Sequence, residues 1–200
     1  MQESVCLHMT LARRRLLGVA AGALLGPLGG CTTTSGAAGE DPAVHRSRID
    51  ASVEAALTKL HAQVPQSREL LAKASGVLVM PQVVSAGLTV GGSYGEGAMR
   101  AGPRTAGYYK VVSAAFGWLF GAQSRAMYML FMSGDGLDRF VSGKGWTAGV
   151  DGSVAVASSG VNGELDTQAL QAPVISFVLT NVGLMANLNL EATRFIRMDL

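Results

Sequence analysis

The sequence has few cysteines and almost no net charge. Its 200 residues include two cysteines, Cys6 and Cys31, and the formal net charge is only +2. Three of the basic residues are the consecutive Arg13, Arg14 and Arg15, so the rest of the chain is close to neutral. A broad basic surface for nucleic acid is therefore not expected. No run of about 18 apolar residues follows Cys31, so no membrane-spanning helix is expected there either.

The N-terminal segment has the organisation of a secretory signal peptide. Its three arginines precede an apolar run from Leu16 to Leu28, and small residues then lead to a cysteine, in the order Leu28-Gly29-Gly30-Cys31. These four residues resemble the lipobox of bacterial lipoproteins. The resemblance implies that residues 1–30 are removed and that Cys31 is acylated, with palmitate among its acyl groups. The sequence thus predicts a lipoprotein of the cell envelope that is anchored to a membrane through acylated Cys31.

The same segment bears on export and on the choice of membrane. Arg13-Arg14 with Leu16-Leu17 resembles a twin-arginine signal, but a plain cationic start of a secretory signal is the favoured interpretation, and both export routes stay open. Thr32 follows the cysteine where an aspartate would retain an enteric lipoprotein at the inner membrane. This favours the outer membrane, on its periplasmic or its surface face. Because Cys6 leaves with the signal peptide, no cysteine pair remains for a disulfide.

The chain after Cys31 divides into a tether and one domain. Residues 31–44 are small and polar and predict a flexible tether. Residues 45–200 are long enough to form a single domain with its own core.

Two helices are expected at the start of this domain. Apolar residues recur at spacings of three to five between Ser47 and Pro65, which predicts a helix with one apolar face. Ser47 and Asp50 have the spacing of a capping box at its beginning. The helix could pack on the rest of the domain or lie on a membrane surface, and its mixed polar face favours packing. A second, short helix is expected over residues 66–74.

From Gly76 onward the pattern changes to short apolar runs separated by glycine, which is typical of strands. About eight strands with short connections predict an antiparallel sheet that curls or closes. Most of the 26 glycines lie between Gly76 and Gly163, as bulges and sheet corners would require. Strands are expected at 76–80, 86–93, 107–113, 125–132, 147–157, 174–179, 184–190 and 193–198, with one short helix at 133–142.

Five ordered segments in this part of the chain resemble the SYLF domain, the Ysc84-type actin- and phosphoinositide-binding family. They are ASGVLVMP at 74–81, GLTVGGSYGEG at 87–97, FGWLFGAQ at 116–123, GVDGSVAV at 149–156 and GLMAN at 183–187. The resemblance implies an α+β fold with a curved or barrel-like antiparallel sheet and N-terminal helices packed against it. It also implies lipid binding. The phosphoinositide specificity of eukaryotic members is not expected here, because most bacteria lack these lipids.

One group of residues could bind a lipid headgroup. Bases and aromatics meet around the expected loop 100–110, and such a mixture suits a phosphate and the membrane interface. The alternative is a solvated hairpin whose tyrosines are half buried. We call this candidate site the cationic rim; its members are Arg100, Arg104, Lys110, Tyr108 and Tyr109.

The sequence offers little for catalysis. His45 and His61 are the histidines after Cys31, and neither has the neighbouring cysteines or carboxylates of a metal site. Asp135 and Asp138 are expected to cap a helix rather than to form a catalytic pair. No enzyme activity, metal or cofactor is therefore expected; a hydrolase that uses His61 is the remaining enzymatic hypothesis.

Two glycine-rich segments resemble phosphate-binding motifs only in part. Residues 143–148 have the spacing of a dinucleotide fingerprint, but an expected helix precedes them and a strand follows, which is the reverse of the required order. Residues 91–97 could cradle an anion, and a bent strand with a hairpin turn is the favoured interpretation. The sequence therefore predicts a lipid-binding envelope lipoprotein. The alternative is a non-enzymatic interaction module with a solid core and a protein partner.

Overall fold

The computed structural model describes residues 40–87, 90–116, 121–157, 169–181, 183–184, 190 and 193–200. All of them belong to one compact unit, Ala37–Leu200. The expected signal peptide, Cys31 and most of the tether lie outside the described residues, so acylation and anchoring stay predictions. None of the helices in the described ranges is long and apolar enough to cross a membrane.

Helix α1 (Pro42–Gln63) begins earlier than its apolar pattern predicts. Asp41 caps it, because its carboxylate accepts a hydrogen bond of 2.7 Å from the backbone amide two residues on. Pro42 follows in the first turn, where its missing amide has no partner to lose. The expected capping box is therefore wrong: Ser47 already lies inside the helix. Residues 42–44, which the sequence assigned to the tether, are helical.

The face that α1 buries is largely the predicted one. Ile49, Val53, Ala56 and Leu60 are buried at spacings of three and four, whereas Val44 stays 57% exposed. Each large aliphatic side chain of this face contributes about 1.5–3 kcal/mol by its burial. The helix is thus docked on the domain. Helix α2 (Ser67–Lys73) follows it and packs Leu70 and Leu71 against the same core.

The nine strands form one mixed sheet in the order β5-β9-β3-β2-β1-β4-β7-β6, with β8 paired to β7. Neighbours are antiparallel except β6 and β7, which are parallel, so the expectation of a purely antiparallel sheet is wrong at this edge. Helix α3 (Gly134–Ser142) follows β4. The strands are β1 (Gly76–Gly87), β2 (Val90–Ala101), β3 (Arg104–Phe116), β4 (Gly121–Phe131), β5 (Gly145–Thr147), β6 (Ala155–Val156), β7 (Val174–Thr180), β8 (Gly183–Leu184) and β9 (Arg194–Met198).

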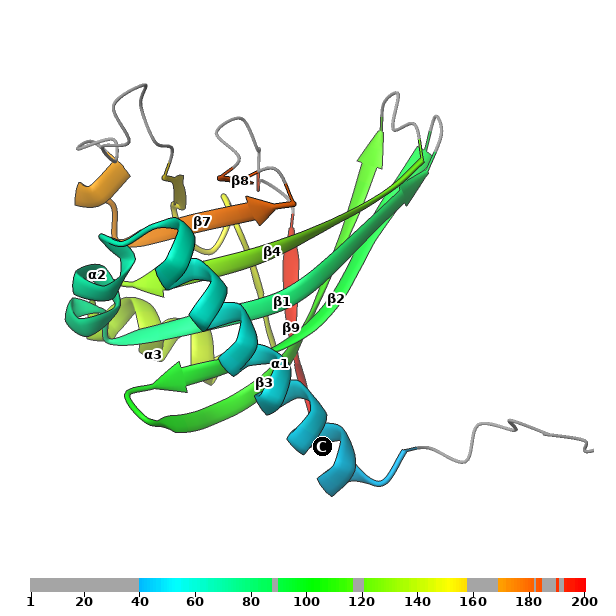
Figure 1. Ribbon diagram of the computed structural model, residues 1–200, viewed down its shortest axis with the longest axis horizontal. Coiled ribbons are helices and arrows are strands. Elements are labelled where there is room, and N and C mark those ends of the chain that lie inside the picture. Colours follow the sequence, from blue (N-terminus) through cyan, green and yellow to red (C-terminus); the bar gives the residue numbers. More distant parts are fainter. Residues whose placement is uncertain are drawn as a thin grey trace, which may run out of the picture. The chain divides into compact units, whose positions relative to one another are not determined.

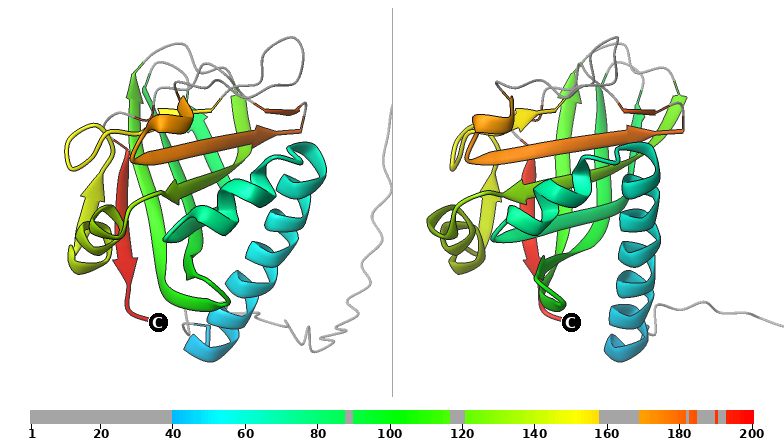
Figure 2. Two further views of the ribbon diagram at one scale, coloured as in Figure 1. Left: turned by 90° about the vertical axis from the view of Figure 1, so that its left-hand side faces the viewer. Right: turned by 60° about the vertical axis from the view of Figure 1, so that its left-hand side comes forward.

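The sheet curls into a half-barrel. Figure 1 shows α1 crossing the outer face of strands β1 and β2, which it contacts. In Figure 2 strands β7 and β9, on opposite sides of the sheet centre, run at a steep angle to each other. Such an angle builds up because each strand of a sheet is rotated relative to its neighbour in the same sense. The predicted α+β class, with a curved sheet and N-terminal helices packed on it, is confirmed.

Strand β1 does not end at Pro81 as the sequence predicts. The pairing with β2 shifts between Val79 and Gln82, so the chain bulges at the proline and then continues to Gly87. A bulge tolerates proline because one residue there makes no ladder hydrogen bond. The expected strand 86–93 is divided between the end of β1 and the start of β2.

The expected strand 147–157 is divided as well. Strand β5 ends at Thr147, whose amide donates a 2.6 Å hydrogen bond to the Asp151 carboxylate. Gly149 has a φ of 81°, a conformation that glycine adopts without strain. Strand β6 begins only at Ala155. Of the expected strand 184–190, the described part covers only its start, in β8, and its last residue, Leu190.

Two hydrophobic clusters lie on the two faces of the sheet. The outer cluster lies between the sheet and helices α1 and α2, and includes Val79, Tyr128 and Phe177. The inner cluster fills the concave face beside α3. Phe140 of α3 lies 4.9 Å, centroid to centroid, from both Tyr109 and Phe131. The concave face next to α3 is therefore occupied by the protein's own side chains.

Candidate functional site

Two members of the cationic rim hold helix α1 on the sheet. Arg100 forms an ion pair with Glu54 and lies 3.9 Å from Asp50. Tyr108 donates a 2.8 Å hydrogen bond to the other oxygen of the Asp50 carboxylate. Burial and the Asp50 carboxylate raise the pKa of Tyr108, so this phenol stays protonated and continues to donate. Arg100 and Tyr108 thus hold the helix, and their polar groups are already engaged.

The other rim residues are not gathered with these two. Tyr109 is 2% exposed and lies on the opposite face of β3, within the inner cluster. Arg104 is exposed at the start of β3, after the turn that contains Gly102. Lys110 lies opposite Glu96 in the register of strands β3 and β2. The alternation of β3 separates Tyr108 from Tyr109, so the five residues do not form one continuous rim.

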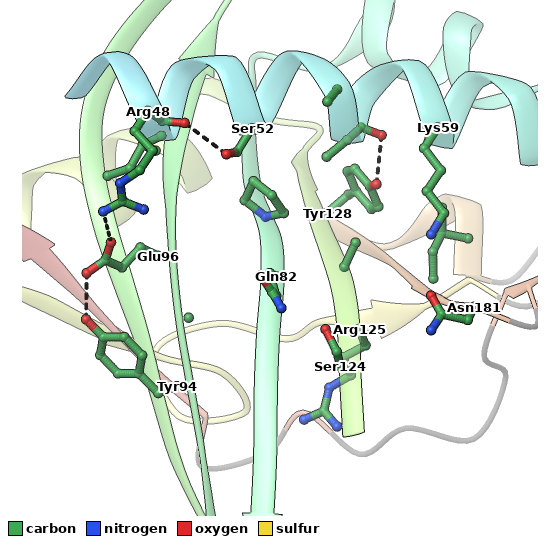
Figure 3. Close-up of a pocket in the computed structure, with 17 residues that line it drawn as sticks. Arg48, Ser52, Lys59, Gln82, Tyr94, Glu96, Ser124, Arg125, Tyr128 and Asn181 are labelled. Atoms are coloured by element: carbon green, nitrogen blue, oxygen red, sulfur yellow. Dashed lines mark hydrogen bonds and ion pairs between the residues drawn. The ribbon is translucent and has the colours of Figure 1, made fainter. Parts of the chain in front are cut away.

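The structure instead places a groove beneath α1, shown in Figure 3. Its volume is about 640 Å³, within the range of small-molecule sites. Helix α1 forms one wall with Arg48, Ser52 and Lys59. Strands β1, β2, β4 and β7 contribute most of the rest, and the lining includes Pro81 and Gln82 at the bulge of β1. The remaining polar lining consists of Gln82, Tyr94, Glu96, Ser124, Arg125 and Asn181.

A polar chain closes one end of this groove. The Arg48 guanidinium donates to Glu96 at 3.5 Å, and Tyr94 donates to the same carboxylate at 2.7 Å (Figure 3). His45 Nε2 lies 2.8 Å from the Glu96 oxygen that Arg48 also contacts. The hydrogen bond to Glu96 and partial burial raise the pKa of Tyr94 to about 12. Arg48, Tyr94 and His45 all contact the Glu96 carboxylate, so these side chains hold this end of the groove together.

The other end of the groove holds a cation with no counter-ion. Lys59 is exposed, and none of the ion pairs among the described residues includes it. Figure 3 shows Asn181 below the Lys59 side chain. An ammonium near a side-chain amide can bind an oxyanion through charge and hydrogen bonds. This end is the part of the groove that is chemically free to bind.

His61 does not lie in the groove. Its Nδ1 is 3.1 Å from the Ser67 hydroxyl, and burial, with a smaller contribution from Arg68, lowers its pKa. Ser67 is fully buried, so its hydroxyl is out of reach of a substrate. The pair ties the end of α1 to the start of α2. Across the described ranges no group of three histidine, cysteine or acidic side chains lies close enough to hold a metal.

The other motifs have structural explanations. Ser133, not Asp135 or Asp138, caps α3, because its hydroxyl accepts from the amide of Gly136. Residues 143–148 run from the end of α3 into β5, the order that argues against nucleotide binding. Residues 91–97 lie within β2, so the strand is confirmed and the hairpin turn is not.

Sequence reasoning missed the groove residues for an identifiable reason. Lys59 and Arg48 lie on the polar face of a helix, where cations are usually only solvated, and Gln82 and Ser124 are ordinary polar residues of strands. The signal that could have found them is Pro81 within an apolar strand, which indicates a bulge. Where the bulge meets α1 depends on tertiary packing.

The architecture defines a class: an α+β half-barrel whose first helix covers a polar groove. The family model of Ysc84, described as Las17-binding protein actin regulator, matches residues 112–199. Residues 112–199 thus match the family that the sequence resembles, which confirms the resemblance over this range. The match runs from within β3 to β9; the segments at 74–81 and 87–97 precede it. None of the curated proteins compared with the chain matches it.

Proposed function

We propose that this protein is a lipoprotein of the cell envelope whose SYLF domain binds anionic phospholipid non-covalently and catalyses no reaction. The observation that carries the proposal is the family match over residues 112–199, since this is a family of lipid- and actin-binding regulators. Acylated Cys31 would hold the chain at a membrane, and Thr32 favours the outer membrane. Each buried methylene of such an anchor contributes about 0.8 kcal/mol.

The groove supplies the site in this proposal. Its free end presents Lys59 with Asn181 and the backbone of the bulged strand nearby. One exposed lysine near an anionic lipid surface contributes about 1 kcal/mol of attraction. Because attachment would already be provided by Cys31, binding in the groove would serve to sense, hold or move a lipid.

A second candidate is an interaction module with a protein partner. The packed aromatic centre of the inner cluster favours it, because Phe131, Phe140 and Trp146 pack against one another on the concave face beside α3. The description of the family also names a protein partner. Such a module would bind its partner equally well with or without anionic lipid.

Vesicle flotation separates the two candidates. Residues 37–200 form a compact unit that contains both clusters, so this segment can be tested without Cys31. We expect it to float with phosphatidylglycerol vesicles and not with phosphatidylcholine vesicles. Lys59→Glu should weaken binding at least about fivefold, because it reverses the free charge of the groove.

Arg104→Glu is the matched control, since it also reverses one exposed cation but lies outside the groove lining. We expect it to leave flotation unchanged. An effect of Arg104→Glu with none of Lys59→Glu would move the site to the predicted rim. Absence of flotation on both kinds of vesicle would refute lipid binding and favour the interaction module.

A further inference from the structure

Arg125, which also lines the groove, lies on the strand face that carries the inner cluster. It pairs with Val83 across strands β4 and β1, and Val83 belongs to the inner cluster. Met127, two residues further along β4, belongs to the same cluster. In Figure 3 the Arg125 guanidinium points away from α1. An arginine thus faces the concave side at the border of an apolar core.

Hydroxyl groups accompany this arginine. The Ser93 hydroxyl accepts a 3.3 Å hydrogen bond from the Arg125 guanidinium and lies 2.7 Å from the Ser85 hydroxyl. Both serines are buried: Ser85 is 3% exposed and Ser93 is 8% exposed. Strand pairing continues the row, since Ser93 faces Ser113 on β3 and Ser85 faces Gln123 on β4. Four neighbouring strands therefore place polar residues in one row beside Arg125.

The positive charge of Arg125 is uncompensated. None of the ion pairs in the described part of the chain includes it, and its buried Nε–H has no hydrogen-bond acceptor. Burial lowers the pKa of the guanidinium, as expected for a cation removed from water. Arg125 is partly buried, and a cation in such a place without a counter-ion costs folding free energy. An anion bound beside it would compensate this charge.

We infer that Arg125, with the hydroxyl groups of Ser85 and Ser93, binds a phosphate-type oxyanion on the inner face of the half-barrel. The guanidinium offers its free Nε–H and its terminal amino groups in the planar fork that suits two phosphate oxygens. The serine hydroxyls can rotate to donate to the same anion. The oxyanion could be the phosphate of a lipid headgroup or free phosphate. Binding of a lipid headgroup at this site rests on the proposed function, whereas binding of free phosphate does not.

Titration with two probes tests this site and its source. The nitrogen-15 signal of the Arg125 Nε–H in residues 37–200 would be followed with inorganic phosphate and, separately, with dihexanoylphosphatidic acid, which is soluble as single molecules. We expect at least one probe to shift this signal in a saturable way. A response to the lipid alone identifies a headgroup site, and a response to phosphate identifies a site for the free anion.

Two substitutions assign the binding to the side chain. Arg125→Met keeps the length of the side chain without its charge and should abolish the thermal stabilisation that the active probe gives. Arg125→Lys keeps the charge without the fork and should weaken binding about tenfold. Arg104→Met removes an exposed arginine and should change neither.

Two results would overturn the inference: no shift of the Nε–H signal with either probe, or full binding of the probe by Arg125→Met. If Arg125→Met binds fully and is less stable than the unaltered protein, the arginine is a purely structural residue. Flotation on phosphatidylglycerol vesicles reports separately on the proposed function. If Arg125→Met still floats as the unaltered protein does and the inner site fails, the groove remains the lipid site.

Discussion

The phenol of Tyr128 donates a 2.8 Å hydrogen bond to the backbone carbonyl of Ala56, which joins strand β4 to helix α1 inside the outer cluster. Tyr128 is fully buried, so water cannot replace this bond. The contact fixes the middle of α1 over the sheet and thereby sets the width of the groove, which both residues line.

Tyr128→Phe should lower the free energy of unfolding by about 1 kcal/mol, the usual net contribution of a buried hydrogen bond. Urea denaturation of residues 37–200 measures it. Tyr94→Phe is the control, because Tyr94 is 51% exposed, and its effect should stay within about 0.5 kcal/mol. Equal effects of the two substitutions would contradict a special role for the Tyr128 contact.

Stability should also fall at alkaline pH through Tyr128. Burial raises the pKa of Tyr128 to about 12 from its ordinary value of 10.0. Between these values the unfolded chain loses the proton that the folded protein keeps, so the contribution is complete below pH 10 and is lost as the pH rises toward 12. Between about pH 9 and pH 12, the free energy of unfolding should fall less steeply with pH for Tyr128→Phe than for the unaltered protein.

Glu96 should govern part of the acid sensitivity. Although burial raises its pKa, hydrogen bonds from His45 and Tyr94 lower it more, so the net pKa lies below 4.5. Its contribution is therefore present above pH 4.5 and is lost as the pH falls through the lowered pKa. Glu96→Gln should flatten the loss of stability in acid. Glu69→Gln, at an exposed ion pair with Lys73, should leave the acid profile unchanged; a profile that Glu96→Gln does not alter would contradict the assignment.

Gly97 should be intolerant of any side chain. It lies opposite the bulge of β1, and an added Cβ would overlap the carbonyl oxygen of Val79 and approach Met80. Gly97→Ala should therefore lower the free energy of unfolding by about 3 kcal/mol. Gly134→Ala, where a Cβ meets nothing within 4 Å, should be neutral or slightly stabilising. Thermal unfolding of both variants provides the comparison, and equal stability of the two would mean that the bulge is not tight.

Local patterns predicted most elements of the fold. The helical face of α1, the strands at β3, β4, β7 and β9, and the α+β class all follow from periodicity and glycine punctuation. The patterns failed at Pro81 and at Thr147, where the chain bulges or turns under the control of tertiary contacts. Alternation of apolar and small residues continues through such a turn, so sequence alone could not divide 147–157.

The site was harder to predict than the fold. Basic residues near tyrosines indicated a rim, but Arg100 is used by Asp50 and Glu54, and Tyr109 lies on the other face of its strand. Ion pairing between elements distant in sequence decides which cations remain free. Lys59 and Arg125 are free of ion pairs in the described part of the chain for that reason, and neither has a local sequence signature.

Native mass spectrometry of residues 37–200 with an added short-chain lipid tests the central claim most directly. The segment lacks Cys31, so any bound lipid is held non-covalently by the domain. We predict a complex with one molecule of dioctanoylphosphatidylglycerol and little complex with dioctanoylphosphatidylcholine at the same concentration. No complex with either lipid, or equal amounts with both, would contradict selective binding of anionic phospholipid by this domain.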